Sequence, residues 1–377
     1  MIKVLFLIHD LGQGGAEKVL VNLVNNMDRS RFQVSVMALF GGGVNEQFLA
    51  KDIRLIICHK KPFPGNSHIM KLFTPERLYC HYIKEKYDII VSYLEGPSAR
   101  IVSGCTDSAT KMITWLHGEQ RTKKKVAGSF RSYDEALRCY NTFDRIICVS
   151  RTVREDFLRL LPVSVPIDVL YNTNESEKIL KLAQESVVSD VFSDKEFKLI
   201  GVGKLLKNKG FHRLVPMIKQ LRDEGLPAHL YILGVGPMKE EIETLAANCG
   251  VSNAVTLLGY HTNPYKYVAK CDLFVCASYA EGFSTAATEA LIVGTPVCTV
   301  EVSGMKEMLG DHNEWGIVTQ NDETALYEGI KRLLDNAALL SHYTEKALER
   351  GRMFNTVNTV MAVEKMLTEL EDETFCA

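Results

Sequence analysis

Short apolar runs alternate with amphipathic segments along almost the whole chain, and glycine or polar turns separate them. The apolar runs are typical of strands buried on both faces, and the amphipathic segments are typical of helices that cover a parallel sheet. In the first half the pattern predicts strands at residues 4–8, 33–39, 54–57, 89–93, 111–116, 145–149 and 167–170. It predicts helices there at residues 16–26, 75–86, 133–140 and 152–160.

The second half repeats the pattern, with strands predicted at residues 197–202, 229–233, 254–258, 273–276, 296–299 and 316–318. The helices predicted between them include residues 212–224, 238–249 and 285–293. This alternation predicts an α/β fold with two Rossmann-like, doubly wound parallel-sheet domains.

The boundary between the two domains is predicted from residues 174–196, which are charged, prone to form helix and without strand patterning. We therefore expect an N-terminal domain at residues 1–175 and a C-terminal domain at residues 176–354. Residues 355–377 have the apolar spacing of a helix but no strand partner. We expect this last helix to cross back and pack on the first domain.

Composition and charge narrow the class of protein. Of the 377 residues, 46% are hydrophobic and 24% are charged, which is ordinary for a folded soluble chain. The net charge of −2 argues against a nucleic-acid binder. Residues 1–172 contain 24 Lys and Arg against 17 Asp and Glu, whereas the remainder contains 20 against 29. Either this difference is chance between two solvated surfaces, or the first domain faces something anionic, such as a membrane surface or a phosphorylated acceptor.

The ten cysteines and the apolar runs also exclude several classes. No two cysteines form a CxxC pair, so neither a zinc site nor a disulfide framework is expected. No stretch approaches the ~20 apolar residues that span a bilayer, and the first apolar run is too short for a signal peptide. We expect a cytoplasmic protein with reduced thiols.

A glycine-rich turn with Gly12, Gly14 and Gly15 follows the first predicted strand and opens a helix. Glycine lets backbone N–H groups approach an anion at a helix N-terminus. The same turn can simply close a tight connection. Its spacing departs from GxGxxG, and no acidic residue ends the second strand, so a dinucleotide site is not favoured.

Lys204 and Lys209 lie five residues apart on the loop 203–210, again between a strand and a helix. On a loop that reverses direction, both ammonium groups can converge on a diphosphate at the carboxyl edge of the sheet. The alternative is a solvated basic loop.

Residues 281–289 carry two carboxylates around the start of a predicted helix. Backbone amides from Gly282 to Thr285 point out of the helix N-terminus, where an anion is favoured. Glu281 and Glu289 suit hydroxyl donors on either side of that anion, such as a sugar and a ribose. The alternative is a capping acid together with a surface glutamate.

With these motifs in order, the chain resembles the retaining glycosyltransferases of family 4, which have two Rossmann-like domains facing across a cleft in the GT-B architecture. The likeness is strongest from residue 199 to 318 and includes the loop 203–210, the run 234–237, the Glu-x7-Glu segment and the run 294–297. In the first domain, Gly14-Gly15-Ala16-Glu17 and Leu116-His117-Gly118 match loops of the family.

The resemblance implies roles for individual residues. Glu281 and the amides that follow it hold the donor sugar, Glu289 accepts from the ribose, and His117 lies beside the reacting sugar. Lys204 and Lys209 neutralise the diphosphate, and Gly15 brings backbone close to it. The implied catalytic residues are Glu281, His117, Lys209 and Lys204, and the implied donor-binding residues are Gly14, Gly15, Gly203, Gly236, Gly259, Tyr260, Gly282, Phe283, Ser284, Thr285 and Glu289.

Two positions depart from the family pattern. Lys204 stands where arginine is common, so a bidentate grip on phosphate is lost. Ser284 stands where glycine is frequent, which changes the donor sugars that fit. Neither change removes the charge that the site needs.

Basic residues follow the His117 loop, namely Arg121, Lys123, Lys124 and Lys125. They are either a solvated charge run or a site for a lipid-diphosphate acceptor or anionic headgroups. The segment 59–73 mixes basic and apolar residues and can rest on a bilayer.

The resemblance therefore implies a retaining glycosyltransferase that needs no metal, which agrees with the absence of an Asp-x-Asp after any predicted strand. We expect it to be cytoplasmic and peripheral to the membrane. It would move sugar from a nucleotide diphosphate, expected to be uridine-linked, to a glycan or polyprenyl-linked glycan, with no cofactor. Two alternatives stay open: a non-hydrolysing nucleotide-sugar epimerase of the same fold, and a non-catalytic nucleotide-sugar-binding subunit.

Overall fold

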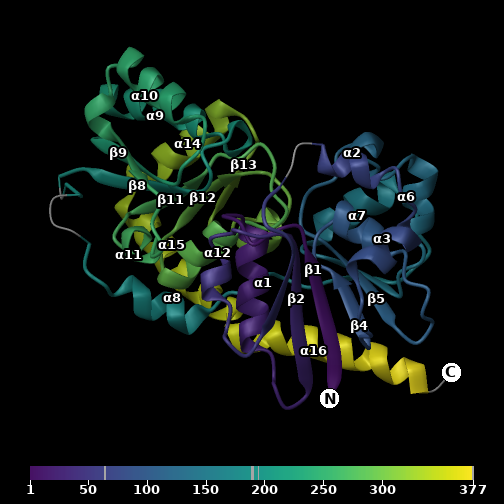
Figure 1. Ribbon diagram of the computed structural model, residues 1–377. Coiled ribbons are helices and arrows are strands. Elements are labelled where there is room, and N and C mark those ends of the chain that lie inside the picture. The colour runs from purple at the N-terminus through teal and green to yellow at the C-terminus, as the bar shows by residue number, and fades with distance from the viewer. Residues whose placement is uncertain (63–64, 188–190, 194, 376–377) are drawn as a thin grey trace. The chain divides into compact units, whose positions relative to one another are not determined.

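The computed structural model describes residues 1–62, 65–187, 191–193 and 195–375. It divides into two compact units, which we call unit 1 (residues 1–173 and 356–377) and unit 2 (residues 174–355). Figure 1 shows each unit as a sheet with helices packed around it. The residues outside the described ranges are Phe63, Pro64, Val188, Ser189, Asp190, Asp194, Cys376 and Ala377.

Unit 1 is built on a parallel sheet with the order β3-β2-β1-β4-β5-β6-β7. The strands are β1 (Ile2–Ile8), β2 (Phe32–Phe40), β3 (Arg54–His59), β4 (Ile89–Ser92), β5 (Lys111–Leu116), β6 (Arg145–Cys148) and β7 (Ile167–Val169). The register of the two central strands pairs Val4 with Ile89 and Leu7 with Ser92. The order reverses direction between β1 and β4, so this pair is the topological switch point of the sheet.

The helices of unit 1 are α1 (Gly15–Asn26), α2 (Asn66–Met70), α3 (Pro75–Tyr82), α4 (Pro97–Val102), α5 (Lys123–Val126), α6 (Tyr133–Tyr140), α7 (Arg151–Leu160) and α16 (Thr356–Phe375), with a 3₁₀ turn at Glu46–Phe48. Four of them begin at residues whose hydroxyl accepts from a backbone N–H of the first turn: Thr74, Thr122, Ser132 and Ser150. Such caps satisfy N–H groups that have no partner inside the helix.

The last helix, α16, packs on unit 1. Val363 and Leu367 are buried, and Glu364 accepts from the backbone N–H of Asp28 at 2.6 Å. Arg31 donates to the hydroxyl of Thr368 at 2.7 Å. In Figure 1 this helix, in yellow, runs beneath the strands of unit 1, at the edge where their N-terminal ends lie.

Unit 2 repeats the design with a parallel sheet of order β10-β9-β8-β11-β12-β13. Its strands are β8 (Phe197–Val202), β9 (Ala228–Leu233), β10 (Val255–Gly259), β11 (Leu273–Cys276), β12 (Val297–Val300) and β13 (Ile317–Thr319). The switch point of this sheet lies between β8 and β11, which pair at Leu199 with Leu273.

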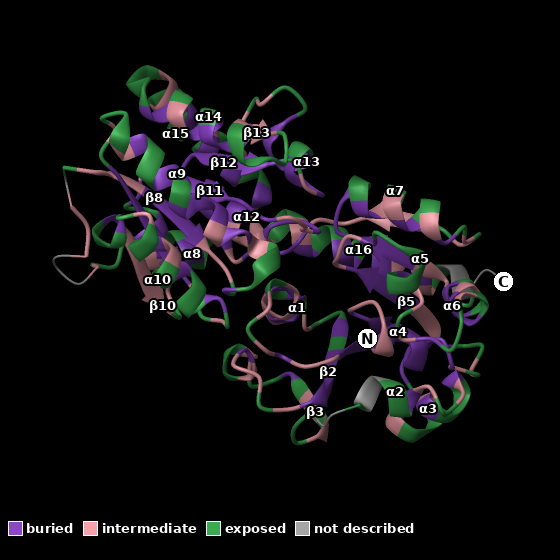
Figure 2. Cartoon of the chain, turned by 90° about the horizontal axis from the view of Figure 1, so that it is seen from above, coloured by how far each residue is buried: buried purple, intermediate pink, exposed green. Residues whose placement is uncertain are grey.

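The helices of unit 2 are α8 (Ser176–Ala183), α9 (Phe211–Asp223), α10 (Lys239–Asn248), α11 (Tyr265–Val268), α12 (Thr285–Val293), α13 (Met305–Leu309), α14 (Glu323–Leu334) and α15 (Ala337–Gly351), with 3₁₀ turns at Lys207–Lys209, Ser252–Ala254 and Arg352–Phe354. The buried core joins strand residues such as Leu230 to helix residues such as Leu214 and Ile330. In Figure 2 the central strands are coloured as buried, whereas the outer sides of the covering helices are exposed.

One predicted helix is shorter in the structure, and the stretch that the sequence predicts to be charged and prone to form helix does contain a helix. The helix predicted at residues 75–86 ends at Tyr82, because Ile83 has extended dihedral angles and is buried. The stretch 174–196 begins with helix α8, whose Ile179 is buried at 2% exposure. None of the helices described is both long and apolar enough to span a membrane.

Candidate active site

Two loops meet at the switch point of unit 2, one after β8 and one after β11. Lys209 from the first loop donates through Nζ to Oε1 of Glu281 from the second loop, at 2.6 Å. The hydroxyl of Ser278 donates to the same carboxylate oxygen at 2.6 Å. The side chains of Lys209 and Glu281 are 28% and 11% exposed, so the pair is largely shielded from water. Open α/β sheets bind ligands at this position.

Lys209 keeps its charge in this setting. Burial alone would lower the pKa of Lys209, but the negative charge of Glu281 and the hydrogen bond to it together outweigh burial and raise that pKa above its ordinary value. The ammonium group is therefore protonated across the physiological pH range. Two of its three N–H bonds can still donate to another acceptor.

The backbone fixes how the two loops meet. Tyr279 donates its N–H to the carbonyl of Asn208 at 2.8 Å, and buried Arg213 donates to the carbonyl of Ala277 at 3.0 Å. Gly210 has a φ of 70°, and a Cβ at this position would lie 2.0 Å from the carbonyl oxygen of Ala277. Glycine is needed here because both the left-handed conformation and the close approach exclude a side chain.

Helix α12 begins directly after Glu281. Ser284 caps it by accepting from the N–H of Ala287 at 3.3 Å, and Thr285 is its first residue. Gly282 and Phe283, between Glu281 and the cap, are buried. The N–H groups of the first helical turn thus point out beside the Lys209–Glu281 pair, which favours an anion there.

Glu289 lies in the same helix and is buried at 6% exposure. The hydroxyl of Tyr265, from α11, lies 3.5 Å from its Oε1. Burial distinguishes Glu289 from the surface glutamate that the sequence left open as an alternative.

Glycines end three neighbouring strands of the same sheet and bring their loops together. The N–H of Gly203 donates to the carbonyl of Leu233 at 2.9 Å, and that of Gly234 donates to the carbonyl of Gly259 at 2.8 Å. A Cβ on Gly236 would lie 2.5 Å from the carbonyl oxygen of Leu205. Beyond these loops the side chain of Tyr260 is 44% exposed.

All of the expected site residues of unit 2 therefore follow the carboxyl ends of four adjacent strands, β10, β9, β8 and β11. Lys204 and Lys209 differ in their surroundings, however. Lys204 is exposed at the start of its loop, whereas Lys209 is drawn into the pair with Glu281.

In unit 1 the expected residues Gly14, Gly15 and His117 also follow strand ends. Gly14 is the N-cap of α1 and Gly15 is the first residue of that helix, after β1. The turn before them is held by Asp10, which accepts from the N–H of Gly12 at 2.7 Å. His117 follows β5, which is separated from β1 by the single strand β4.

His117 is held by a residue that the sequence did not single out, Glu95, in the loop after β4. Glu95 accepts through Oε2 from the N–H of His117 at 3.0 Å and through Oε1 from the side chain of Gln120 at 3.1 Å. A Cβ on Gly118 would lie 2.8 Å from the same Oε1. In the sequence, Glu95 could be noticed only as an acidic residue just after a buried strand. The pairing of β4 with β5 is what places it against His117.

Burial changes the ionisation of both side chains. It raises the pKa of Glu95 and lowers the pKa of His117 to about 3. His117 is therefore a neutral imidazole near pH 7. Its Nε2 is buried and has no hydrogen-bond partner among the described residues.

The basic run after His117 is partly engaged within unit 1. Arg121 pairs with the carboxylate of Glu119 at 2.9 Å, and Lys125 donates to the carbonyl of Glu119 at 2.5 Å. The ammonium group of Lys123 lies 4.8 Å from the centre of the Tyr133 ring. Lys124 is exposed on α5.

Comparison with families of known proteins matches both halves of the chain. Residues 184–350 match the family described as "Glycosyl transferases group 1". Residues 13–174 match the family described as "Glycosyltransferase Family 4". Together the two matches account for most of units 2 and 1, respectively.

Two curated proteins illustrate the likeness. The chain is 28% identical to an N-acetylgalactosamine-N,N'-diacetylbacillosaminyl-diphospho-undecaprenol 4-alpha-N-acetylgalactosaminyltransferase of Campylobacter jejuni, over 97% of this chain and 100% of the relative. It is 23% identical to the lipopolysaccharide core biosynthesis glycosyltransferase LpsD of Rhizobium meliloti, over 88% of each chain.

Solved structures share the fold. HepE of Anabaena, in complex with UDP and glucose, superposes with a TM-score of 0.76 at 19% identity, over 98% of this chain and 100% of HepE. WaaG, a glycosyltransferase involved in lipopolysaccharide biosynthesis, superposes with a TM-score of 0.74 at 17% identity, over 97% of this chain and 99% of WaaG.

Proposed function

Because this chain is a glycosyltransferase of the GT-B fold, we propose that it transfers a sugar from a uridine diphosphate sugar to a glycan carried by a polyprenyl diphosphate lipid. The observation that carries the proposal is the Lys209–Glu281 pair at the switch point of unit 2, beside the N-terminus of α12. The name of the Campylobacter relative describes a glycan on diphospho-undecaprenol, and the Anabaena neighbour contains UDP. Both support this choice of acceptor and donor.

On the donor side, each feature meets one part of a nucleotide sugar. Lys209 and the exposed Lys204 offset the charge of the diphosphate, together with the N–H groups at the start of α12. Glu281 accepts from hydroxyls of the sugar. Buried Glu289 accepts from the ribose hydroxyls.

In unit 1, the resemblance to family 4 assigns the backbone N–H groups of Gly14 and Gly15 to the diphosphate. His117, as a neutral imidazole, makes one hydrogen bond to the reacting sugar through Nε2. Glu95 positions His117 by holding its backbone N–H.

The proposed reaction proceeds with retention of configuration and without a metal ion. The acceptor hydroxyl attacks the anomeric carbon from the face that the diphosphate leaves. The bond from that carbon to the diphosphate oxygen breaks, and the same oxygen takes the hydroxyl proton. The two lysines and the start of α12 stabilise the charge on the departing UDP. These groups are held in position before the reaction begins.

Unit 1, which we assign to the acceptor, contains more Lys and Arg than Asp and Glu. Arg121, Lys123, Lys124 and Lys125 follow the His117 loop, and we assign them to the diphosphate of the lipid-linked acceptor. A cytoplasmic enzyme, peripheral to the membrane, follows from an acceptor of this kind.

The test is a transfer assay with purified protein. Short-chain polyprenyl diphosphate glycans are incubated with UDP-glucose, UDP-galactose or their N-acetylated forms, in EDTA or in Mg²⁺. Mass spectrometry should detect addition of one sugar, at the same rate in both conditions, and proton NMR should detect an α-linkage. Interconversion of UDP-sugars without acceptor would instead indicate an epimerase. Binding of UDP without any transfer would indicate a non-catalytic subunit.

A further inference from the structure

Arg213, in the first turn of α9, is a buried cation whose side chain is 3% exposed. Through Nη1 it donates to the carbonyl of Ala277 at 3.0 Å and to the side-chain oxygen of Asn321 at 2.9 Å. Its guanidinium carbon lies 4.7 Å from the centre of the Tyr279 ring. Within the described part of the chain no carboxylate pairs with Arg213, and its Nε is buried without a hydrogen-bond partner.

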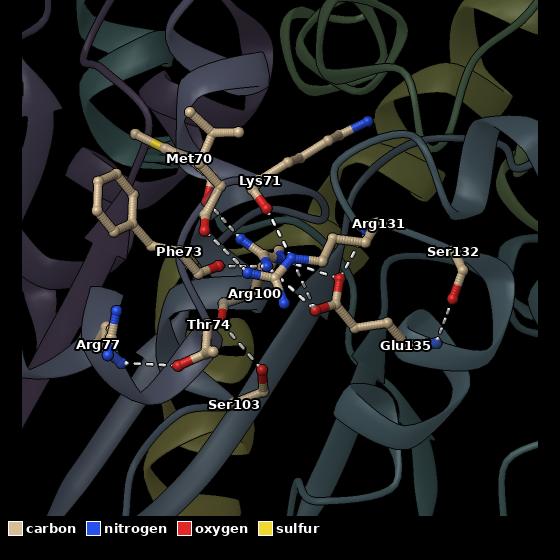
Figure 3. Close-up of polar contacts among 11 residues, drawn as sticks. Met70, Lys71, Phe73, Thr74, Arg77, Arg100, Ser103, Arg131, Ser132 and Glu135 are labelled. Carbon is tan, nitrogen blue, oxygen red and sulfur yellow. Dashed lines mark hydrogen bonds and ion pairs between the residues drawn. The ribbon is translucent and has the colours of Figure 1, made fainter.

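Another buried arginine of this chain does have a counter-ion. Arg100 of unit 1 is 1% exposed and donates to both carboxylate oxygens of Glu135, at 3.2 and 3.1 Å. Figure 3 shows these two side chains facing each other. Burying a cation without such a partner lowers the stability of a fold. A gain in stability therefore does not account for Arg213, whereas departures of this kind are typical of functional sites.

Two partners of the guanidinium group belong to the loop after β11 (residues 277–284), which contains Glu281. They are Ala277 and Tyr279, and Ser278 lies between them. The hydroxyl of Ser278 donates to Oε1 of Glu281 at 2.6 Å. The guanidinium group therefore contacts the residues on both sides of the one that holds the carboxylate.

The third partner, Asn321, lies in the loop between β13 and α14. Its side-chain amide donates to the carbonyls of Ser278 and Glu301, each at 3.4 Å. Arg213 thus joins its own helix, which follows β8, to the loops after β11 and β13. These contacts hold the residues just before Glu281 from two directions.

The arrangement suits a guanidinium group better than an ammonium group. A guanidinium group is planar, so it can lie on an aromatic ring and donate to oxygens at its edge at the same time. An ammonium group is a compact point charge, without a plane to place on the ring. Arg213→Lys therefore keeps the charge but loses the geometry that holds the loop.

We propose that Arg213 is a positioning residue, which holds the loop after β11 so that Glu281 meets the donor sugar in the geometry that transfer requires. The inference rests on the proposed function, because that function assigns Glu281 to the sugar. Arg213 acts only through the loop. A displacement of about 1 Å can lower a rate by ~100-fold, so loss of this support should lower kcat. UDP has no sugar for Glu281 to hold, so UDP affinity should not change.

The first experiment compares Arg213→Lys with the wild type. The variant should lower kcat of sugar transfer by at least about tenfold, while the dissociation constant of UDP stays within about twofold. The control Arg222→Lys makes the same change near the other end of α9, at an arginine that donates to the carbonyl of Ala228 at 3.0 Å. This control should behave as the wild type does, and an equal loss of kcat in the two variants would overturn the assignment.

A double-variant cycle with Glu281→Gln distinguishes positioning from a general weakening of unit 2. If Arg213 acts through Glu281, its substitution has little left to remove once the carboxylate is gone. Arg213→Lys should then lower kcat of Glu281→Gln by no more than about twofold. General weakening would instead multiply the two losses, so a further loss of about tenfold in the double variant would overturn positioning. The thermal midpoint of each variant checks that it is folded.

Hydrogen exchange tests the support of the loop without any substrate. Peptides that cover residues 277–281 should exchange at least about tenfold faster in Arg213→Lys, whereas peptides from β9 should not change. Asn321→Ala, at an exposed residue, should accelerate the same peptides to a smaller extent, and it serves as the test should Arg213→Lys not fold.

Unchanged exchange of residues 277–281 in both variants would overturn the proposal. Absence of sugar transfer by the wild type would instead overturn the proposed function, since the exchange measurement does not depend on it.

Discussion

The ion pair between Lys209 and Glu281 predicts opposite effects for two substitutions. Lys209→Met keeps the length of the side chain but removes the cation from the diphosphate site. Glu281→Gln keeps the shape of the carboxylate but removes the charge that now competes with a phosphate for Lys209. The first variant should therefore weaken UDP binding, and the second should leave it unchanged or strengthen it.

The magnitudes follow from the geometry of the pair. A hydrogen bond that involves a charged group contributes about 1.5–3 kcal/mol, and ~1.4 kcal/mol corresponds to a factor of ten. Lys209→Met should thus raise the dissociation constant of UDP by roughly 10- to 150-fold. Glu281→Gln should instead lower kcat, by about 100-fold or more, since it removes a charged contact to the reacting sugar.

Calorimetry with UDP and an assay of UDP release in the presence of acceptor measure the two effects. Lys219→Met and Asp223→Asn are matched controls, because these residues form an exposed pair at 2.5 Å on α9 of the same unit. Both controls should behave as the wild type does. Equal weakening of UDP binding by Lys209→Met and Glu281→Gln would refute the reasoning, since it would mean that the pair only joins two loops.

Three further predictions concern stability and pH. Glu95 holds its proton more tightly when folded, so the free energy of unfolding should fall as pH rises above the ordinary glutamate pKa of 4.5. Urea unfolding at several pH values should show that this fall in stability with pH is absent in Glu95→Gln. An identical pH dependence in the wild type and the variant would contradict the burial of the carboxyl beside His117. Glu135→Gln should lower the stability by about 3–5 kcal/mol, because it leaves a buried guanidinium without its counter-ion; a loss within the ±0.5 kcal/mol of an ordinary surface substitution would contradict that role. Gly234→Ala should lower the stability by about 2–5 kcal/mol, since its Cβ would lie 1.8 Å from a carbonyl oxygen and its φ is positive. Gly225→Ala has open space around it and should lower the stability only by the backbone strain of about 1–2 kcal/mol. Equal thermal shifts for the two variants would rule out the clash.

Local patterning was sufficient to predict most of the elements. The strands Lys111–Leu116 and Leu273–Cys276 have the predicted bounds, because polar or turn-forming residues flank continuous apolar runs. Helix Thr285–Val293 also has its predicted bounds, with Ser284 as a hydroxyl cap and Gly294 in the left-handed conformation at its end.

Contacts between distant parts of the chain could not be predicted from local patterns. Lys209 and Glu281 are 72 residues apart, and they meet only because β8 lies beside β11. Glu95 reaches the N–H of His117 for the same reason, through the pairing of β4 with β5. The spacing of residues along the chain does not indicate that these side chains are neighbours.

The two lysines of the loop 203–210 illustrate the same limit. The sequence predicts that Lys204 and Lys209 converge, with no means of ranking them. In the structure the left-handed turn at Gly210 and the bond between Asn208 and Tyr279 pull the end of the loop toward β11. Lys209 is therefore held by Glu281, while Lys204 stays exposed.

The central claim is that unit 2 binds a uridine diphosphate sugar at its switch point, and a thermal-shift panel tests it most directly. Diphosphates of each base and the corresponding nucleotide sugars are compared, with and without Mg²⁺, on the wild type and on Glu289→Ala. At 100 times its dissociation constant a ligand should stabilise the fold by about 2.7 kcal/mol. We predict stabilisation by uridine ligands alone, independent of Mg²⁺ and lost in Glu289→Ala. No shift with any nucleotide, or an undiminished shift in Glu289→Ala, would contradict the account.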